Sequence, residues 1–510
     1  MRRFLTAMTA ALLAGCTVGP DYHPADVVPV PAAFAGPQPV GAGIDPATWW
    51  TAFGDPQLTG LIKRALKDNP DIGVAAARVR EARLQEIVAR SNGGPQLNAS
   101  ANATHVEFSK NAGFSSLARL FGGGSGGGSS GGGSGSSSGI ALPGSGITTY
   151  AAGFDASWEL DVFGGVRRGV QAATARTEAA EWNRRDAAVM IAAEVAQAYL
   201  ALRADQAQAA VIEAELARQR GALTIAGNIA KVGLVPPIDV TRQRGSITNS
   251  EARLAPIRAD IDVRRHALAI LLAQPPAALD AELTQPGVVL PPAPAIPAGL
   301  PSDLLRRRPD VRAAERNLAA ASAEIGVATA DLYPHFSLTG MAQLISTALS
   351  NLVTGDSLQL TGTGGVQLPL LDGGRRRATV KLREAQRDEA LLQYRGIVLQ
   401  ALRDVEDPLA QIAAERERHA ALARAVADAA ESERAIGAQY RTGFVAQDAL
   451  LNAQAQSLSA REQLTLSDAQ LRQQTVALFK ALGGGWEGLD AVAGRSVTGG
   501  WAPARPPAQE

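Results

Sequence analysis

The chain of 510 residues carries 49 Lys and Arg against 49 Asp and Glu, so its formal net charge is zero. A neutral chain has no excess of basic side chains to neutralise phosphates, which argues against nucleic acid as a partner. The 5 histidines are scattered, and the sequence has neither metal-ligand spacing nor a catalytic Ser, His and Asp pattern. We therefore predict that the chain has no metal site and no catalytic residue, and that it is not an enzyme.

The N-terminal segment has the features of an export signal. Arg2 and Arg3 precede an apolar stretch that is too short to span a bilayer as a helix, and Leu13-Ala14-Gly15-Cys16 follows. This run resembles a lipobox, so we expect residues 1–15 to be a signal peptide that is cleaved before Cys16. Diacylglycerol and an N-linked acyl chain on Cys16 would anchor the chain stably, and no other cofactor is predicted. The alternative is an ordinary signal peptide with a coincidental cysteine.

The next segment is irregular and leads into a helix. Residues 16–56 precede the first helix, and the stretch up to about Ala47 is rich in Pro, Ala and Gly and is predicted to be an extended tether. Helical periodicity starts near Gln57, and the Asn92-Gly93-Gly94-Pro95 run ends it. We therefore predict one helix over this stretch.

Two strands follow, at about 96–108 and 147–162, and a Gly- and Ser-rich loop at 122–139 lies between them. Apolar residues such as Phe154 and Trp158 alternate with polar ones such as Asp155. Strands with one apolar and one polar face suit a membrane β-barrel with a wet lumen. A sheet packed on a soluble core would alternate in the same way.

A very long helix from about Val166 to Ala230 and a return helix from about Ile238 to Leu272 complete the first half. Gly233 lies in the turn between them, where glycine permits a positive φ. Helices this long need neighbours to bury their apolar stripes, which indicates coiled-coil packing. A Pro-rich linker at 274–301 follows.

The second half repeats the order of the first. We predict strands at about 335–345 and 357–370, then a long helix to about Tyr440, a turn at Gly443 and a return helix. Two tandem copies of a helix–strand–strand–long helix–return helix unit are therefore predicted, at 57–273 and 302–482, followed by a tail at 483–510. The matching motifs are Asn69-Pro70-Asp71 with Arg308-Pro309-Asp310, and Gly164-Gly165 with Gly373-Gly374.

Four strands per chain cannot close a barrel. Bare sheet edges in lipid cost several kcal/mol per unpaired backbone group, and the smallest closed membrane barrels have about eight strands. The chain should therefore associate with copies of itself. Two, three or four copies would all satisfy this requirement.

The sequence resembles the TolC/OprM outer-membrane factors, in the NodT-type lipoprotein branch that serves resistance-nodulation-division efflux pumps. The motifs that carry the resemblance are Cys16-Thr17-Val18-Gly19-Pro20-Asp21-Tyr22, Trp49-Trp50, Asn69-Pro70-Asp71, Trp158-Glu159-Leu160-Asp161-Val162-Phe163-Gly164, Arg307-Arg308-Pro309-Asp310, Leu371-Asp372-Gly373-Gly374 and Tyr440-Arg441-Thr442-Gly443.

The resemblance implies a mainly α-helical homotrimer in which a twelve-stranded membrane barrel joins a long α-helical barrel that extends into the periplasm. It also implies an equatorial belt that includes the Trp49-Trp50 segment, and lipid anchoring in the outer membrane. Thr17 after the lipidated cysteine, in place of Asp, agrees with that location. The implied partners are a periplasmic adaptor and an inner-membrane resistance-nodulation-division pump. The implied function is passive conduction of drugs or other small molecules through a gated duct.

The resemblance also suggests the position of the gate. Where the family has an acidic residue in a Leu-Asp-Ala-Gln run, this chain has Asn452, and Asp448 lies one helical turn earlier. Three copies of Asp448 would form a cation-attracting ring, unless Asp448 only caps its helix or makes a salt bridge there. Asp239 and Arg242 are expected to hold the gate shut.

The hairpin turns are the expected contacts of the adaptor. The residues concerned are Val232, Gly233, Leu234, Thr442, Gly443 and Phe444. Leu234 and Phe444 could instead pack each turn onto its own helices. Two other functions stay open: a duct for type I protein secretion, and a periplasmic coiled-coil tether without a pore.

Overall fold

The computed structural model describes residues 17–24, 34, 45–107, 147–232, 236–284 and 307–487. Cys16, the Gly- and Ser-rich loop, Gly233, Leu234 and most of the predicted linker and tail lie outside these residues. The chain forms two compact units, and each takes segments from both halves of the sequence. Unit 1 comprises Met1–Asp21, Gln85–Ala173 and Ser322–Ala385, and unit 2 comprises Tyr22–Leu84, Thr174–Ala321 and Gln386–Glu510.

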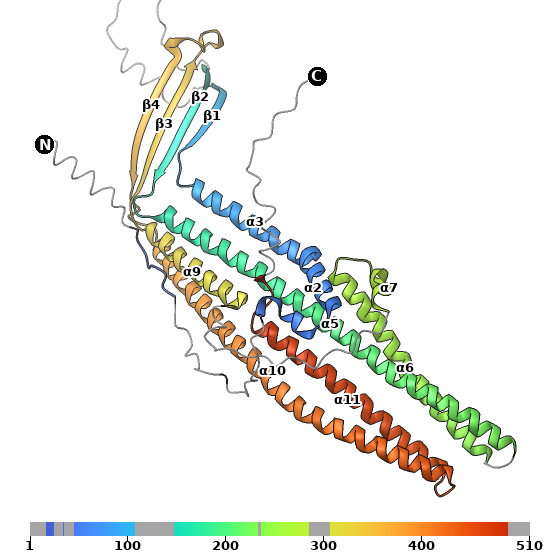
Figure 1. Cartoon of the computed structure of the whole chain (residues 1–510). Helices are drawn as coiled ribbons and strands as arrows, with labels where there is room; N and C mark the ends of the chain where they lie inside the picture. Colours follow the sequence, from blue (N-terminus) through green and yellow to red (C-terminus); the bar gives the residue numbers. More distant parts are fainter. Residues whose placement is uncertain are drawn as a thin grey trace, which may run out of the picture. The chain divides into compact units, whose positions relative to one another are not determined.

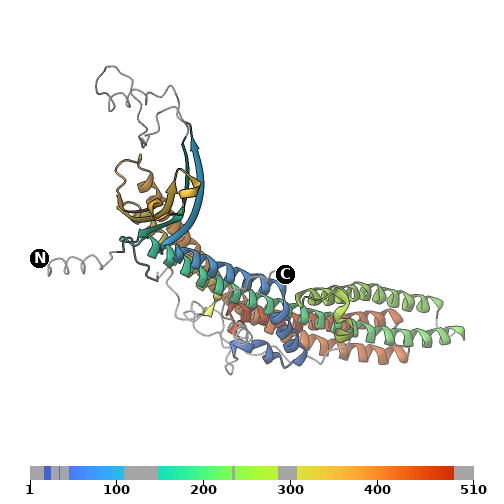
Figure 2. The ribbon, with the colours of Figure 1, turned by 90° about the horizontal axis from the view of Figure 1, so that it is seen from above.

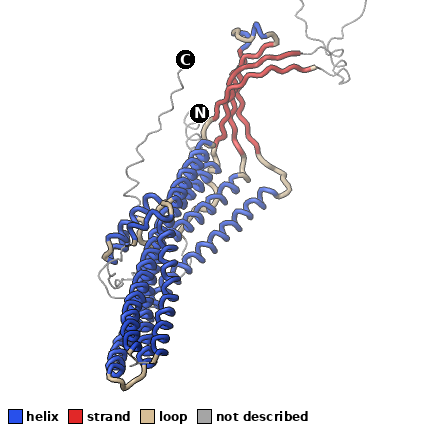
Figure 3. The backbone as a smooth tube through the Cα atoms, turned by 90° about the vertical axis from the view of Figure 1, so that its right-hand side faces the viewer, coloured by secondary structure: helices blue, strands red, loops and turns tan. Residues whose placement is uncertain are grey.

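Unit 1 contains a four-stranded antiparallel sheet in the order β1-β2-β3-β4 (Figures 1 and 3). The strands are β1 (Gln96–Val106), β2 (Ile147–Leu160), β3 (His335–Ser346) and β4 (Leu358–Gln367). Two short 3-10 turns, η3 (Leu349–Asn351) and η4 (Gly355–Ser357), lie between β3 and β4. The predicted extension of the last strand to residue 370 is wrong, because Pro369 has no N–H to donate to a neighbouring strand.

The single helix predicted from Gln57 to about residue 91 is also wrong. The structure has two helices there, α2 (Pro56–Asp68) and α3 (Pro70–Ser91). Asn69 between them is extended, with φ −64° and ψ 130°. A residue before proline is pushed out of the helical region, and Pro70 lacks the N–H that would continue the helix. Pro70 instead starts α3, and the side chain of Asn69 accepts a hydrogen bond from the Asp71 N–H at 2.8 Å.

The two halves contain helices of equal length. α3 and α9 (Pro309–Ala330) have 22 residues each, α5 (Gly165–Lys231) and α10 (Arg375–Arg441) have 67, and α6 (Pro237–Leu271) and α11 (Gln447–Ala481) have 35. At about 1.5 Å per residue, α5 and α10 are each roughly 100 Å long. Within unit 2, the α5–α6 and α10–α11 hairpins lie side by side (Figure 2). Arg218 of α5 pairs with Glu433 of α10 at 3.2 Å, and Arg253 of α6 pairs with Glu462 of α11.

The core of unit 2 joins the N-terminal segment to both hairpins. In η1 (Pro46–Phe53), Trp49 and Phe53 are fully buried, and the Trp49 ring stacks on Phe479 of α11 with centroids 5.0 Å apart. The same cluster contains Tyr199 of α5 and residues of α2, α6 and α10. Two short helices after α6, η2 (Pro276–Leu279) and α7 (Asp280–Leu283), add buried leucines to it. Residues far apart in the sequence therefore share one hydrophobic core.

Candidate functional site

The sheet of unit 1 has one apolar and one polar face. Residues that pair directly across strands point to the same side of a sheet. One row across the four strands reads Ala99, Phe154, Ala342 and Leu360. The adjacent row, on the other face, reads Ser100, Gly153, Gln343 and Gln359. The predicted alternation therefore lines up across all four strands.

Nothing in the described part of the chain covers the apolar face. Phe154 is 57% exposed, Leu338 is 51% exposed and Leu360 is 72% exposed. Large exposed apolar patches on a protein usually mark contacts with a membrane or a partner, so we expect this face to be covered in the assembled protein. The alternative of a sheet packed on a soluble core would have buried them.

The outer edges of the sheet are open. Among the described residues, β1 pairs only with β2, and β4 pairs only with β3. Each edge strand therefore presents a row of backbone N–H and C=O groups without sheet partners. An open edge on both sides allows one sheet to pair with the sheets of two other copies.

The turn after α10, in unit 2, has the geometry that the sequence predicted. Gly443 has φ +78°, its N–H bonds to the Tyr440 carbonyl at 3.0 Å, and the Phe444 N–H bonds to the Gln439 carbonyl at 2.9 Å. These two bonds form a Schellman motif, which needs a residue with positive φ at the position of Gly443. The Phe444 side chain is 83% exposed, and Val232 at the end of α5 is 69% exposed. Phe444 therefore does not pack onto its own helices.

The predicted gate residues lie at the starts of the return helices. Asp239 is half-buried in the first turn of α6 and pairs with the exposed Arg242 at 3.6 Å. Burial raises the pKa of Tyr440 at the end of α10, and the negative charge of Asp239 raises it further. Asp239 therefore lies within electrostatic range of the end of α10.

Asp448 and Asn452 are exposed and one turn apart on α11. The N-cap of α11 is Ala446, which makes no side-chain capping bond, so Asp448 is not the cap. Within the described ranges, no hydrogen bond or ion pair joins Asp448 or Asn452 to Asp239 or Arg242. Asp448 lies in the first turn, where a negative charge is favourable to the helix dipole.

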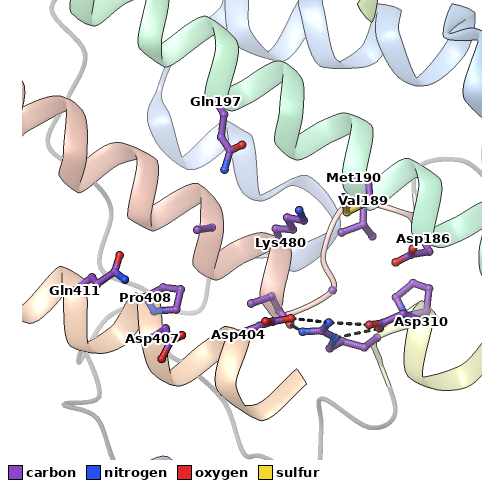
Figure 4. A pocket seen from close by; sticks show the side chains of 15 residues that line it. Asp186, Val189, Met190, Gln197, Asp310, Asp404, Asp407, Pro408, Gln411 and Lys480 are labelled. Atoms are coloured by element: carbon purple, nitrogen blue, oxygen red, sulfur yellow. Dashed lines mark hydrogen bonds and ion pairs between the residues drawn. The ribbon is translucent and has the colours of Figure 1, made fainter. Parts of the chain in front are cut away.

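Sequence reasoning missed a polar cavity of about 420 Å³ in unit 2, lined by α5, α10, α11 and the start of α9. Figure 4 shows Asp186, Asp310 and Asp404 around it. The Arg308 guanidinium pairs with Asp310 at 2.7 Å and with Asp404 at 3.1 Å. Burial, and then the charge of Asp310, raises the pKa of Asp186 to about 6. The Arg-Pro-Asp motif marked one wall of this cavity, but no pattern pointed to Asp186.

Comparison with known proteins gives one family. Residues 61–274 and 300–484 match the family model described as outer membrane efflux protein. The chain is 30% identical to the outer membrane protein OprJ of Pseudomonas aeruginosa, over 94% of this chain and 95% of that protein. It is 29% identical to nodulation protein T of Rhizobium leguminosarum bv. trifolii, over 90% of this chain and 92% of that protein.

Two further similarities bear on location and fold. The probable outer membrane lipoprotein SilC of Salmonella typhimurium is 28% identical over 95% of this chain and 99% of that protein. The solved structure of the outer-membrane channel OprN superimposes with a TM-score of 0.82 at 29% identity, and covers 92% of this chain and 100% of that one. The chain therefore shares the fold of an outer-membrane channel along nearly its whole length.

Proposed function

The chain belongs to the outer membrane efflux protein family, and on that premise we propose that it is the gated, trimeric outer-membrane duct of a tripartite efflux pump. Like its relatives, it is an efflux component of the outer membrane. The duct would conduct drugs or other small molecules passively from a periplasmic adaptor and an inner-membrane resistance-nodulation-division pump to the exterior.

One observation carries this proposal: the sheet of unit 1 has an exposed apolar face and two open edges. Lipid would cover the apolar face, and the edges would pair with the edges of other copies. Three copies of a four-stranded sheet would close a barrel of twelve strands with the polar face inward. The equal helix lengths of the two halves support descent from two copies of one unit, and the helices of three chains would form the periplasmic barrel.

The gate and the adaptor contacts belong to the hairpin ends. The exposure of Asp448 and Asn452 supports a ring of polar side chains around the threefold axis. Asp239, paired with Arg242 and close to Tyr440, would hold the first hairpin against the second. The exposed side chains of Val232 and Phe444, together with the neighbouring turn residues, would receive the adaptor.

The membrane anchor is the lipid on Cys16. The lipobox-like run and the similarity to the lipoprotein SilC support it. A diacylglycerol and an N-acyl chain give enough buried methylene groups for stable anchoring.

The proposal is tested by deleting the chain from its host and measuring retention of a fluorescent pump substrate. The deletion strain should retain more dye than the parent, and the wild-type chain should restore efflux. A tagged chain should also capture the adaptor and the pump after cross-linking. Normal efflux in the deletion strain, together with capture of a secretion partner, would contradict the efflux assignment.

A further inference from the structure

The residues that follow Cys16 are held at the base of the sheet by a buried arginine. Arg168, in the first turn of α5, is 4% exposed. Its guanidinium donates hydrogen bonds to the Val18 and Gly19 carbonyls, both at 3.1 Å, and pairs with the Asp21 carboxylate at 2.8 Å. The third nitrogen, Nη1, donates to the Gln171 side chain on the same helix at 3.0 Å. An arginine stays charged when buried, so most of its compensation comes from the N-terminal segment.

The backbone of this segment approaches the helices too closely for side chains. Gly19 has φ +88°, and a Cβ there would lie 2.5 Å from the Gly326 Cα of α9. A Cβ on Gly326 would lie 2.7 Å from the Arg168 side chain. The glycines and Arg168 therefore form a fitted groove for the extended chain.

The segment also contacts the connection between β2 and α5. The Val18 N–H bonds to the Phe163 carbonyl at 3.1 Å, and a Cβ on Gly164 would lie 2.8 Å from the Thr17 side chain. Phe163 and Gly164 lie in the short connection between β2, which ends at Leu160, and α5, which begins at Gly165. Cys16 is bonded to Thr17, so a lipid on Cys16 is attached one residue from this junction.

We propose that Arg168 is a positioning residue that clamps Thr17–Asp21 and thereby sets the depth of the lipid anchor relative to the sheet. The inference rests on the lipidation of Cys16 proposed above. With the clamp closed, the anchor and the sheet enter the membrane together, and the open edges of β1 and β4 are presented to other copies at one depth. An anchor joined through a flexible segment would hold the chain at the membrane without fixing the depth of its sheet, and this would slow trimer formation.

The first experiment separates attachment from positioning. A Gly/Ser linker of about ten residues is inserted between Cys16 and Thr17, and trimer formation is followed by pulse–chase labelling. The insertion should slow trimer formation by roughly threefold or more, because a slack tether lowers the effective concentration of correctly placed sheets. The same linker between residues 40 and 41 should leave the wild-type rate. Equal rates in both insertions would overturn the proposal.

The second experiment tests the clamp itself. In the lipidated full-length protein, Arg168→Ala should speed hydrogen exchange of the Val18 amide by about tenfold and slow trimer formation. Arg376→Ala is the matched control, because Arg376 lies in the first turn of α10 and its guanidinium pairs with Asp372 at 3.3 Å. Unchanged exchange and assembly in Arg168→Ala would overturn the clamp.

Mass spectrometry of the N-terminal peptide keeps the two proposals distinct. An unlipidated wild-type Cys16 would refute the anchor. A lipidated Cys16 with wild-type assembly in both the linker and Arg168→Ala variants would refute the positioning role alone and leave the anchor in place.

Discussion

The Tyr199 hydroxyl donates a hydrogen bond of 2.5 Å to the carboxylate of Asp55. The other Asp55 oxygen accepts from the Gln57 N–H at 2.7 Å and the Leu58 N–H at 3.3 Å, which caps α2. Burial raises the pKa of Tyr199 well above its usual value, and the bond to Asp55 raises it further. One buried carboxylate therefore starts α2 and fastens it to the long helix α5.

Asp55→Ala should destabilise the protein by about 2–4 kcal/mol, because it removes a helix cap and the shorter of the two hydrogen bonds that the Tyr199 hydroxyl makes to Asp55 and Gln57. Denaturant unfolding of the detergent-solubilised protein measures this. Asp45→Ala is the control, since Asp45 caps η1 at an exposed position. The control should lose much less stability, and equal losses would mean that the bond to Tyr199 contributes nothing.

Asp186→Asn should make the protein more stable at high pH and leave it unchanged at low pH. The Asp186 pKa is about 6 in the folded protein against an ordinary value of 3.8. The folded state therefore favours the protonated carboxyl of Asp186. The stability that this preference contributes is fully present below the ordinary pKa of 3.8, and it is lost as the pH rises through the folded-state pKa of about 6. Near pH 8 the gain should be about 1–3 kcal/mol. Thermal unfolding across this range tests it, with Asp407→Asn in the same cavity as the control.

Asp448→Ala should lower the cation selectivity of the channel and change its conductance in planar bilayers, because it removes the proposed ring of three carboxylates. Asp448→Glu keeps the charge and should stay close to wild type. Identical selectivity in the wild type and Asp448→Ala would remove Asp448 from the gate, and would leave only its favourable place at the start of α11.

Phe444→Asp should abolish capture of the adaptor while the trimer stays intact, because it places a charge on the most exposed apolar residue of the second turn. Val353→Asp is a matched control, since Val353 is 84% exposed and lies between β3 and β4. Pull-down of the adaptor by each purified variant is the measurement. Normal capture by Phe444→Asp would refute this contact.

The sequence predicted the elements better than it predicted their contacts. Alternation and helical periodicity are local signals, so the strands and the long helices agree with the structure to within a few residues. Pro70 was available as a helix breaker, but the surrounding periodicity on both sides of it favoured a single helix. The bond between Asp55 and Tyr199 and the clamp of Arg168 on Val18 join residues far apart in the chain, and no spacing rule indicates such pairs. The raised pKa of Asp186 depends on burial by several helices, which only the fold shows.

The mass of the purified particle tests the central claim most directly. The account predicts that the wild-type chain, extracted from the outer membrane and weighed by native mass spectrometry, is a complex of three copies that needs detergent or lipid to stay in solution. A single chain that remains soluble after its detergent is removed would contradict it, because the apolar face and the open edges of the sheet would then have no lipid or neighbouring copy to cover them.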